Sequence, residues 1–379
     1  MSTSPADVVR PFRVEVPQAE VDDLAGRLAR TRWPEPAPAA AEDGSRGLST
    51  ARVRELVEHW RAGWDWRTQE AALNAWPQVT TTVDGTTLHA LHVRSAEPDA
   101  VPLLLVHGWP GSVVEFQRVL GPLTDPRAYG GDPADAVHLV VPSLPGYGFS
   151  GPLPDTGWTT TRMARALAEL MRRLGYDRYA AHGGDWGSRV VADLAVLAPG
   201  HLLGIHVTMV MGLVPEEPAT DAERRAVERA RHFRGEMSGY NLLQATRPLS
   251  LVPALTDSPV GQLAWIAERF AEWTDPASSI DVDQLLTDVA VYWFTRTAGT
   301  SAQLYWETRH SAGYGEWSRD VPTGVAVFPY ELVPPTRRVV SAAVHLVHWS
   351  EFDRGGHFPA MEVPELLVGD LRAFLRSVR

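Results

Sequence analysis

One short segment constrains the fold of this chain more than any other feature of the sequence: Gly183-Gly-Asp-Trp-Gly187. A glycine two residues before and after a central side chain is typical of a nucleophile elbow, a sharp strand-to-helix turn that lifts that side chain above a sheet. The flanks agree, because Arg178–His182 can form a short buried strand and Ser188–Ala198 has apolar residues three and four apart. The segment therefore predicts a strand, a turn that presents Asp185, and a helix.

The central residue of this turn is an aspartate, and its chemistry indicates a class of reaction. A carboxylate that attacks a saturated carbon leaves an ester, which water can later cleave, whereas a serine would leave an inert ether. Asp185 therefore favours displacement at a saturated carbon, as in an epoxide or an alkyl halide, over acyl transfer. The alternative is that Asp185 only caps the following helix, and the segment alone does not separate the two.

Composition excludes several other classes of function. The 379 residues carry a formal net charge of −11, which argues against a nucleic acid or an anionic membrane as partner. The chain has no cysteine and no lysine, which excludes disulfides, thiol nucleophiles, cysteine-bound zinc and lysine Schiff bases. The N-terminus has no signal-peptide pattern, and the longest apolar run, Val101–Val106, is too short to span a membrane. We therefore expect a soluble cytoplasmic protein.

The order of predicted elements indicates an α/β fold with a mostly parallel sheet. From Val101 onward, short apolar strands alternate with amphipathic helices, which is typical of such a sheet. A helical stretch interrupts the alternation, as in a cap domain that closes an apolar pocket over strand ends. We expect a mainly helical N-terminal region at 1–95, the first part of the core at 96–212, the helical cap at 213–320 and the second part of the core at 321–379.

Periodicity and turn residues place the individual elements. Helices are expected at Gln18–Arg30, Ser49–Trp60, Thr161–Leu174, Asp221–Arg234, Val260–Trp273, Val282–Gly299 and Pro364–Val378. Strands are expected at Leu103–Val106, His138–Val141, Thr323–Phe328 and Val344–His348, with one more ending near Met211 and a hairpin of Val79–Thr82 and Thr86–Val93.

Two kinds of motif that could suggest a cofactor or a metal are better explained without one. Gly146–Gly151 matches the glycine pattern of a dinucleotide site, but two prolines follow and block the helix that would hold a pyrophosphate, so it is expected to be a loop. The pairs His89/His92 and His345/His348 lie in predicted strands, where residues three apart face opposite sides and cannot chelate one ion. We expect structural histidines, no cofactor and no metal.

Two other segments have the positions that partners of an aspartate nucleophile need. His107-Gly-Trp-Pro-Gly-Ser112 follows a buried strand, where a turn can aim the backbone N–H of Trp109 into the site. Together with the N–H of Trp186 it would form an oxyanion hole, although a plain tight turn is the alternative. His357 follows the last strand after two glycines, and a histidine late in the chain is the order found in hydrolases with such a sheet.

A carboxylate must orient that histidine, and the sequence offers two positions for it. Glu331 follows the strand that precedes the last one. Glu216 and Glu217 follow a neighbouring strand and are the alternative. Asp353 is close to His357 in sequence but is expected to face solvent.

With these segments in place, the sequence resembles the microsomal-type epoxide hydrolases over nearly its whole length. The core signatures that carry the resemblance are His107-Gly-Trp-Pro, Gly183-Gly-Asp-Trp-Gly-Ser, Pro322-Thr-Gly-Val-Ala-Val-Phe-Pro-Tyr-Glu331 and Gly355-Gly-His-Phe-Pro-Ala-Met-Glu-Val-Pro-Glu-Leu-Leu. The segments similar to the family's N-terminal region are Arg32-Trp-Pro and Asp65-Trp-Arg-Thr-Gln-Glu-Ala-Ala-Leu-Asn. The resemblance implies an α/β-hydrolase fold with a helical cap. The sequence departs from the mammalian members in lacking their membrane-anchoring N-terminal helix, so we expect a soluble bacterial member.

The resemblance also implies two tyrosine acids in the cap, one in a Ser-Gly-Tyr context and one after a long helix. The matching residues are Tyr240 and Tyr305. In the implied mechanism these phenols hydrogen-bond and protonate the epoxide oxygen while Asp185 attacks a ring carbon. His357, held by Glu331, then activates the water that cleaves the ester, and the product is a vicinal diol.

Two other functions remain as alternatives. A haloalkane dehalogenase has the same Asp-His-acid core but needs halide-binding N–H donors rather than paired tyrosines. A non-catalytic ligand-binding protein on a hydrolase scaffold can lose these groups freely, whereas here all five positions are retained. Trp109, Pro110 and Trp186 are expected to line the substrate pocket, which with an aromatic cap suggests a bulky or aryl epoxide. Besides this substrate and water, a homodimer is the one partner we consider.

Overall fold

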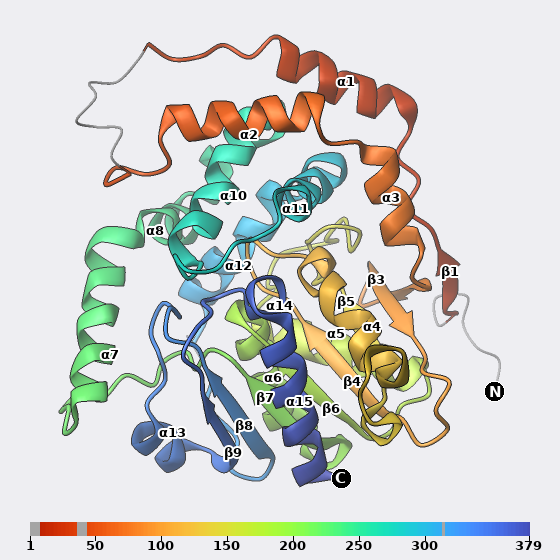
Figure 1. The fold of residues 1–379 in the computed structure, drawn as a ribbon, viewed down its shortest axis with the longest axis vertical. Helices are drawn as coiled ribbons and strands as arrows, with labels where there is room; N and C mark the ends of the chain where they lie inside the picture. The colour runs from red at the N-terminus through yellow and green to blue at the C-terminus, as the bar shows by residue number, and fades with distance from the viewer. Residues whose placement is uncertain (1–7, 36–43, 313–314) are drawn as a thin grey trace.

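A single sheet runs through the centre of the computed structural model, which describes residues 8–35, 44–312 and 315–379 (Figure 1). Its strands are β1 (Arg10–Phe12), β2 (Gln78–Val83), β3 (Thr86–Val93), β4 (Val101–Val106), β5 (Val137–Pro142), β6 (Tyr179–Gly183), β7 (Leu202–Val207), β8 (Pro322–Val327) and β9 (His345–Glu351). The order across the sheet is β1-β2-β3-β5-β4-β6-β7-β8-β9. The six neighbouring strands β5, β4, β6, β7, β8 and β9 pair in parallel. Strands β1, β2 and β3 extend the β5 edge in antiparallel pairing. The predicted α/β fold with a mostly parallel sheet is confirmed.

Helices cover both faces of this sheet and one of its ends. The N-terminal helices are α1 (Gln18–Ala29), α2 (Thr50–Ala62) and α3 (Trp66–Asn74). The helices of the core are α4 (Gln117–Thr124), α5 (Thr160–Arg173), α6 (Asp185–Leu197), α13 (Arg337–Ala343), α14 (Pro359–Glu362) and α15 (Pro364–Val378). Residues 213–320, which we call the cap segment, contain α7 (Asp221–His232), α8 (Gly239–Thr246), α9 (Val252–Asp257), α10 (Pro259–Trp273), α11 (Val282–Thr295) and α12 (Ala298–His310). Among the described residues, no helix is long and apolar enough to cross a lipid bilayer.

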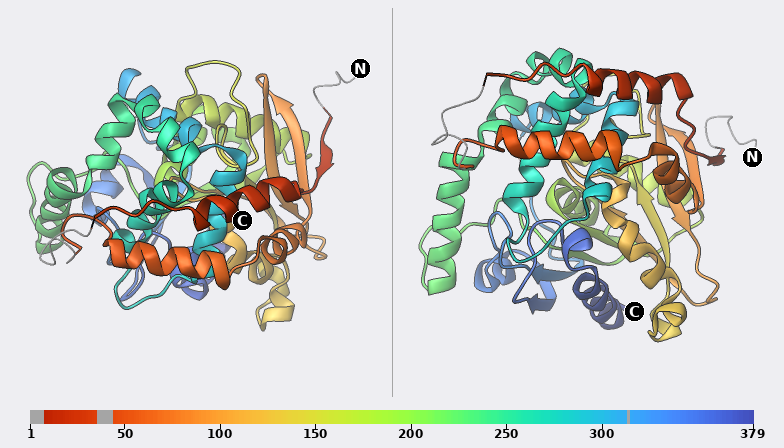
Figure 2. Two further views of the ribbon diagram at one scale, coloured as in Figure 1. Left: turned by 90° about the horizontal axis from the view of Figure 1, so that it is seen from above. Right: turned by 45° about the horizontal axis from the view of Figure 1, so that its top comes forward.

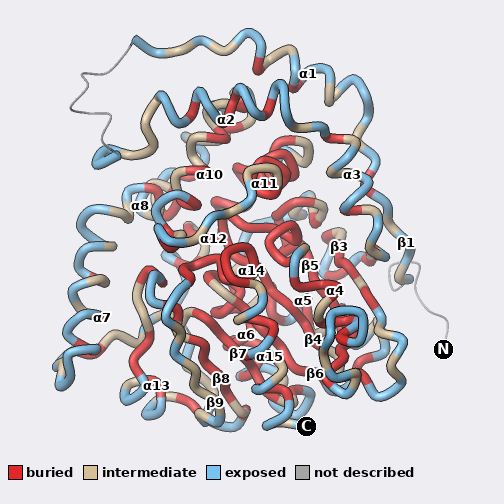
Figure 3. The backbone as a smooth tube through the Cα atoms, in the orientation of Figure 1, coloured by how far each residue is buried: buried red, intermediate tan, exposed pale blue. Residues whose placement is uncertain are grey.

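Strand β4 shows why the central strands are apolar throughout. Leu103 and Leu105 face a core shared with α4 and α15. Leu104 and Val106 face the opposite way, into a core shared with α5 and α6. Because residues two apart lie on one side of a strand, a continuous apolar run fits a strand covered by helices on both faces. Figure 3 shows this burial along the middle of the sheet.

The N-terminal region contacts both the sheet and the cap segment. It contributes β1, β2 and β3 to the sheet, and α1 and α2 pack on α10 (Figure 2). Nε2 of His59 on α2 hydrogen-bonds Oδ1 of Asp283 on α11 over 2.6 Å. Nε1–H of Trp64 donates to Oγ1 of Thr287 on α11 over 3.2 Å. The region therefore braces the cap segment from the side opposite to the sheet.

The structure differs from the sequence prediction where the chain turns without glycine or proline. The helix expected over Val282–Gly299 ends at Thr295, because Arg296 adopts a left-handed conformation with φ of +56°. The next helix, α12 (Ala298–His310), was not predicted. The strand expected to end near Met211 is β7, which ends at Val207. Periodicity also missed α3, α4, α8, α9, α13, α14 and β1, all of which are short.

Gly187 offers a test of the close contact between α6 and β4. A Cβ at this position would lie 2.0 Å from the carbonyl oxygen of Val106, so the helix would have to move away from the strand. We expect Gly187→Ala to lower the free energy of unfolding by about 3 kcal/mol or more, measured by urea denaturation. Gly200→Ala is the matched control, because no atom lies within 4 Å of its added Cβ. Equal midpoints for the two variants would contradict this account of the contact.

Candidate active site

Three glycines let the backbone pack closely enough to form the turn that carries Asp185. Asp185 follows β6 directly and is the first residue of α6, with φ of +45°. A Cβ on Gly108 would lie 2.3 Å from Oδ1 of Asp185. A Cβ on Gly183 would lie 2.3 Å from the carbonyl oxygen of Gly187, which itself packs against β4. The spacing of glycines around Asp185 is therefore a packing requirement, and it fixes where the carboxylate lies.

A backbone donor at the end of β4 holds this carboxylate. The N–H of Trp109 donates a hydrogen bond to Oδ1 of Asp185, with an N–O distance of 2.8 Å. The start of α6 also favours a negative charge there, because the helix dipole is positive at its N-terminus. Asp185 is only 7% exposed, so few water molecules compete for it. Trp109 is thus in contact with the predicted nucleophile, while the donor role of the Trp186 N–H stays a prediction.

His357 lies between Asp185 and Glu331. Its Nδ1–H donates to Oε1 of Glu331 over 2.7 Å, and its Nε2 lies 3.5 Å from Oδ2 of Asp185. Oε1 of Glu331 also accepts the N–H of Leu332 over 2.7 Å, which fixes the carboxylate. The structure therefore places Glu331 behind the histidine.

The alternative carboxylates lie elsewhere. Glu216 and Glu217 are exposed to solvent, and the side chain of Asp353 is 89% exposed. Asp353 faces solvent as expected from its place in the loop before His357. Glu331 is therefore the carboxylate that can orient His357.

The two carboxylates set the protonation state of His357. Burial by itself lowers the pKa of a histidine, but the negative charges of Glu331 and Asp185 outweigh it and raise the pKa of His357 well above its ordinary value. His357 is therefore an imidazolium while both carboxylates are charged. If Asp185 lost its charge, one of the two anions that hold this proton would be gone.

Tyr240 and Tyr305 reach the same place from two helices of the cap segment. Tyr240 on α8 stacks on the indole of Trp109, with ring centroids 5.1 Å apart and an interplanar angle of 9°. Tyr305 on α12 meets Trp186 edge to face at 4.9 Å. The two phenol rings are 6.0 Å apart. The structure therefore gathers all five predicted catalytic side chains around the start of α6.

The environment of the two phenols keeps them protonated. Burial, followed by the charge of Asp185, raises the pKa of Tyr240, and the nearby Arg269 opposes this. Burial also raises the pKa of Tyr305 well above its ordinary value. Among the described residues, the phenol oxygen of Tyr305 has no hydrogen-bond partner. An unpaired buried hydroxyl is costly, which is expected where a ligand oxygen completes the site.

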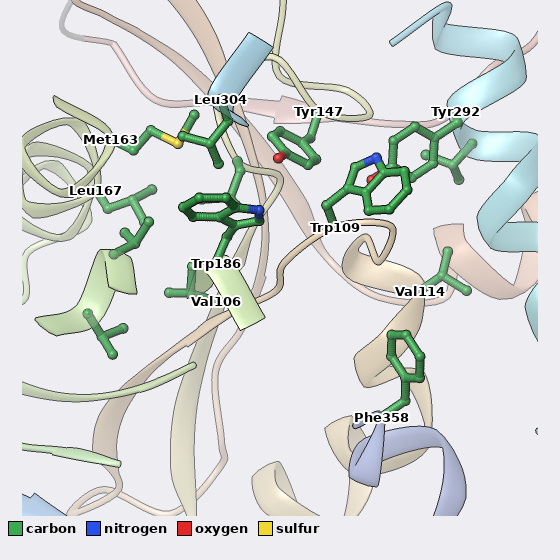
Figure 4. Close-up of a cluster of buried hydrophobic side chains, with 14 of the residues drawn as sticks. Val106, Trp109, Val114, Tyr147, Met163, Leu167, Trp186, Tyr292, Leu304 and Phe358 are labelled. Carbon is green, nitrogen blue, oxygen red and sulfur yellow. The ribbon is translucent and has the colours of Figure 1, made fainter. Parts of the chain in front are cut away.

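Aromatic side chains from the core and the cap segment enclose these groups. Figure 4 shows Trp109 and Trp186 among Tyr147, Tyr292 and Leu304, all of which are buried. Pro110 is buried beside Trp109. The residues that we expected to line a substrate pocket are thus at the nucleophile.

Two buried carboxyl groups near the site were not anticipated. Burial raises the pKa of Glu115 to about 8 and that of Asp288 to about 8, so both are mostly uncharged at neutral pH. Oγ of Ser112 donates to Oδ1 of Asp288 on α11 over 2.6 Å, and this bond joins the loop at residues 107–112, which carries Trp109, to the cap segment. Glu115 follows the same segment, and its apolar neighbours Val113, Val114 and Phe116 are the one local sign in the sequence that it is buried.

A second cluster of histidines holds α15 against the sheet. Nε2 of His206 on β7 and Nε2 of His348 on β9 lie 2.9 and 2.8 Å from the two carboxylate oxygens of Asp370 on α15. These three side chains offer ligand atoms within 4.8 Å of one another, but hydrogen bonds already pair them. His89 is likewise paired, with Ser143 and Gln78. The expected structural role of His89 and His348 agrees with these contacts.

Comparison with known proteins identifies the class. The family model described as "Epoxide hydrolase N terminus" matches residues 9–116, and that described as "alpha/beta hydrolase fold" matches residues 101–240. A protein of Stigmatella aurantiaca (strain DW4/3-1) named "Putative epoxide hydrolase" is 46% identical over 98% of this chain and 86% of its own length. Epoxide hydrolase 1 of Sus scrofa is 33% identical over 97% of this chain and 88% of its own. The solved structure of Aspergillus niger epoxide hydrolase matches with a TM-score of 0.88 and 32% identity, over 98% of this chain and 97% of that one.

The fold is that of the α/β hydrolases. The matches to epoxide hydrolases cover nearly the whole chain. The chain therefore belongs to the epoxide hydrolase family, which confirms the resemblance seen in its sequence.

The charge coupling between Asp185 and His357 can be tested directly. Asp185→Asn removes one of two negative charges that hold the imidazolium proton, so we expect the pKa of His357 to fall. The measurement is a pH titration of the His357 ring by ¹H–¹⁵N NMR. Asp353→Asn, which removes an exposed carboxylate from the same loop, should leave that pKa unchanged. An unaltered His357 titration in Asp185→Asn would contradict the coupling.

Proposed function

We propose that this protein hydrolyses an epoxide to a vicinal diol through an ester on Asp185. One observation carries the proposal most: the carboxylate of Asp185 accepts the N–H of Trp109 while Nε2 of His357 lies 3.5 Å from its other oxygen. A buried carboxylate held in this way can attack a ring carbon, and a base lies beside the ester that results. The membership of the chain in the epoxide hydrolase family supports the same reaction.

In the first step the bond from Asp185 to the ring carbon forms as the ring C–O bond breaks. The oxygen that leaves becomes an alkoxide, which is a strong base and needs a proton at that moment. Tyr240 or Tyr305 donates this proton, and the high pKa of both phenols keeps the proton in place until then. The unpaired phenol oxygen of Tyr305 supports its place beside the epoxide oxygen.

In the second step His357 becomes the base. Ester formation removes the charge of Asp185, so the pKa of His357 falls, its proton is released and the phenolate regains one. Neutral His357, oriented by Glu331, then takes a proton from the water that adds to the ester carbonyl. The N–H groups of Trp109 and Trp186 would stabilise the oxyanion that forms. Release of the diol restores the carboxylate and the imidazolium.

The surroundings of Asp185 suggest a bulky or aryl epoxide. Near the nucleophile, Trp109 stacks on Tyr240 and Trp186 meets Tyr305 edge to face, and such aromatic surroundings favour an aromatic or large apolar group. A haloalkane is the rival substrate, because it would also leave an ester on Asp185. A halide leaves as a stable anion that needs no proton, so the paired phenols favour the epoxide.

The phenols provide one test of the reaction. We expect Tyr240→Phe and Tyr305→Phe each to slow alkylation of Asp185 only in part, because the remaining phenol can still donate a proton. The double variant has no phenol left at this place, so its alkylation rate should fall by about 10²–10⁴-fold. Stopped-flow tryptophan fluorescence measures the step, and Tyr129→Phe is a control at an exposed tyrosine. An unchanged rate in the double variant, or faster dehalogenation of a 1-haloalkane than opening of an epoxide by the wild type, would contradict the assignment.

His357 provides a separate test. Since His357 acts only on the ester, His357→Gln should still alkylate Asp185 and then stall. Intact-mass spectrometry should show a stable adduct equal to the mass of the epoxide. A folded variant that stays unmodified after long incubation with the epoxide would exclude this division of roles.

A further inference from the structure

The loop that carries His357 is tied to the cap segment by hydrogen bonds that involve two buried carboxylates. Glu362 on α14 accepts the N–H of Phe358 at Oε1 and the N–H of Asp275 at Oε2, each over 2.9 Å. Asp275, just after α10, accepts the N–H of Gly355 at Oδ2 over 2.8 Å. The backbone N–H of His357 itself donates to the carbonyl oxygen of Trp273 over 3.0 Å. We call this set of bonds the clasp.

The clasp is buried, and the backbones in it touch. Asp275 and Glu362 are both buried, so their bonds are shielded from water. A Cβ on Gly356 would lie 2.5 Å from the carbonyl oxygen of Trp273 and 2.8 Å from the amide nitrogen of Asp275. Gly355 has φ of +96°, which few other residues adopt. The two glycines before His357 are therefore required for contact with the cap segment as well as for the turn.

The same part of the cap segment also contacts the catalytic rings. The indole of Trp273 meets the His357 imidazole edge to face at 5.0 Å, and lies 5.3 Å from the ring of Tyr240. The end of α10 thus lies against both the predicted base and one predicted acid. From the core, the His357 side chain is held by the hydrogen bond from Nδ1 to Glu331 and by its contact with the Asp185 carboxylate.

We propose that Glu362 and Asp275 are positioning residues for ester hydrolysis, because the clasp makes the cap segment fix the His357 ring against Glu331 and Asp185. This inference rests on the proposed function. Alkylation of Asp185 does not use His357 as a base, so a loosened clasp should slow the second step and spare the first. A residue with only a general structural role would lower both steps in proportion to the loss of folded protein.

Glu362→Gln is the first test. The amide oxygen can accept one of the two N–H groups, but the amide NH₂ cannot accept the other, so one bond of the clasp is lost. We expect alkylation within about twofold of the wild type and ester hydrolysis on the order of 10- to 100-fold slower, as for other residues that orient a reactive side chain. The alkyl-enzyme should accumulate in intact-mass spectra. Glu365→Gln, at an exposed position three residues on, should change neither rate.

Asp275→Asn is the second test, and it removes an acceptor from the other side of the clasp. It should show the same selective loss, and thermal unfolding identifies any variant that is simply less folded. Unchanged ester hydrolysis in both variants, or equal losses in both steps, would overturn the clasp. The ¹⁵N resonances of the His357 ring in Glu362→Gln give a readout that needs no substrate.

The proposed function and the clasp can be tested separately. If wild-type protein forms no ester with any epoxide, the proposed function fails, and the clasp is then judged by the ring resonances alone. Shifted resonances in Glu362→Gln would support the clasp, and resonances identical to those of the wild type would overturn it.

Discussion

The site depends on backbone segments that approach one another where no side chain intervenes. Gly108, Gly183 and Gly187 allow the ends of β4 and β6 and the start of α6 to touch, and a Cβ at any of them would overlap a neighbouring atom. That contact places the Asp185 carboxylate under the N–H of Trp109. The left-handed backbone of Asp185 carries some strain, which the surrounding packing must hold in place. The roles of His357 and the two phenols depend on this fixed position of the Asp185 carboxylate.

Around that carboxylate, the core provides charged groups and the cap segment provides buried neutral ones. The core contributes two negative charges, Asp185 and Glu331, that share one proton on His357. The cap segment contributes neutral phenols whose protons are held by burial. Because the charge on Asp185 disappears when the ester forms, a single event would convert His357 from a proton carrier into a base. The proposed clasp through Glu362 keeps the imidazole in place during that change.

The sequence was informative where the chemistry is local and silent where it depends on distant contacts. The glycines around Asp185 allow close backbone packing, and Gly355 before His357 has a positive φ, so the spacing of glycines in the sequence could predict the turn and the loop. The carboxylate that orients His357 could only be narrowed to two positions, Glu331 or Glu216 and Glu217. The choice depends on which strand end lies beside His357, and that is decided by the pairing of the whole sheet. The burial of Glu115 and Asp288 could not be predicted, because it depends on the packing of α11 against residues 107–116 in the tertiary structure. The end of α11 could not be predicted either, because the left-handed residue that follows it is Arg296 and not the glycine or asparagine usual at such a position.

The central claim is that Asp185, and not water, attacks the epoxide. A single turnover in H₂¹⁸O, with enzyme in excess over the epoxide, tests it most directly. Water that attacks the ester carbonyl leaves its oxygen on the enzyme, so the account predicts ¹⁸O in the peptide that contains Asp185 and an unlabelled first diol. Label in that first diol, with none in the peptide, would mean that water opens the ring itself and would contradict the account.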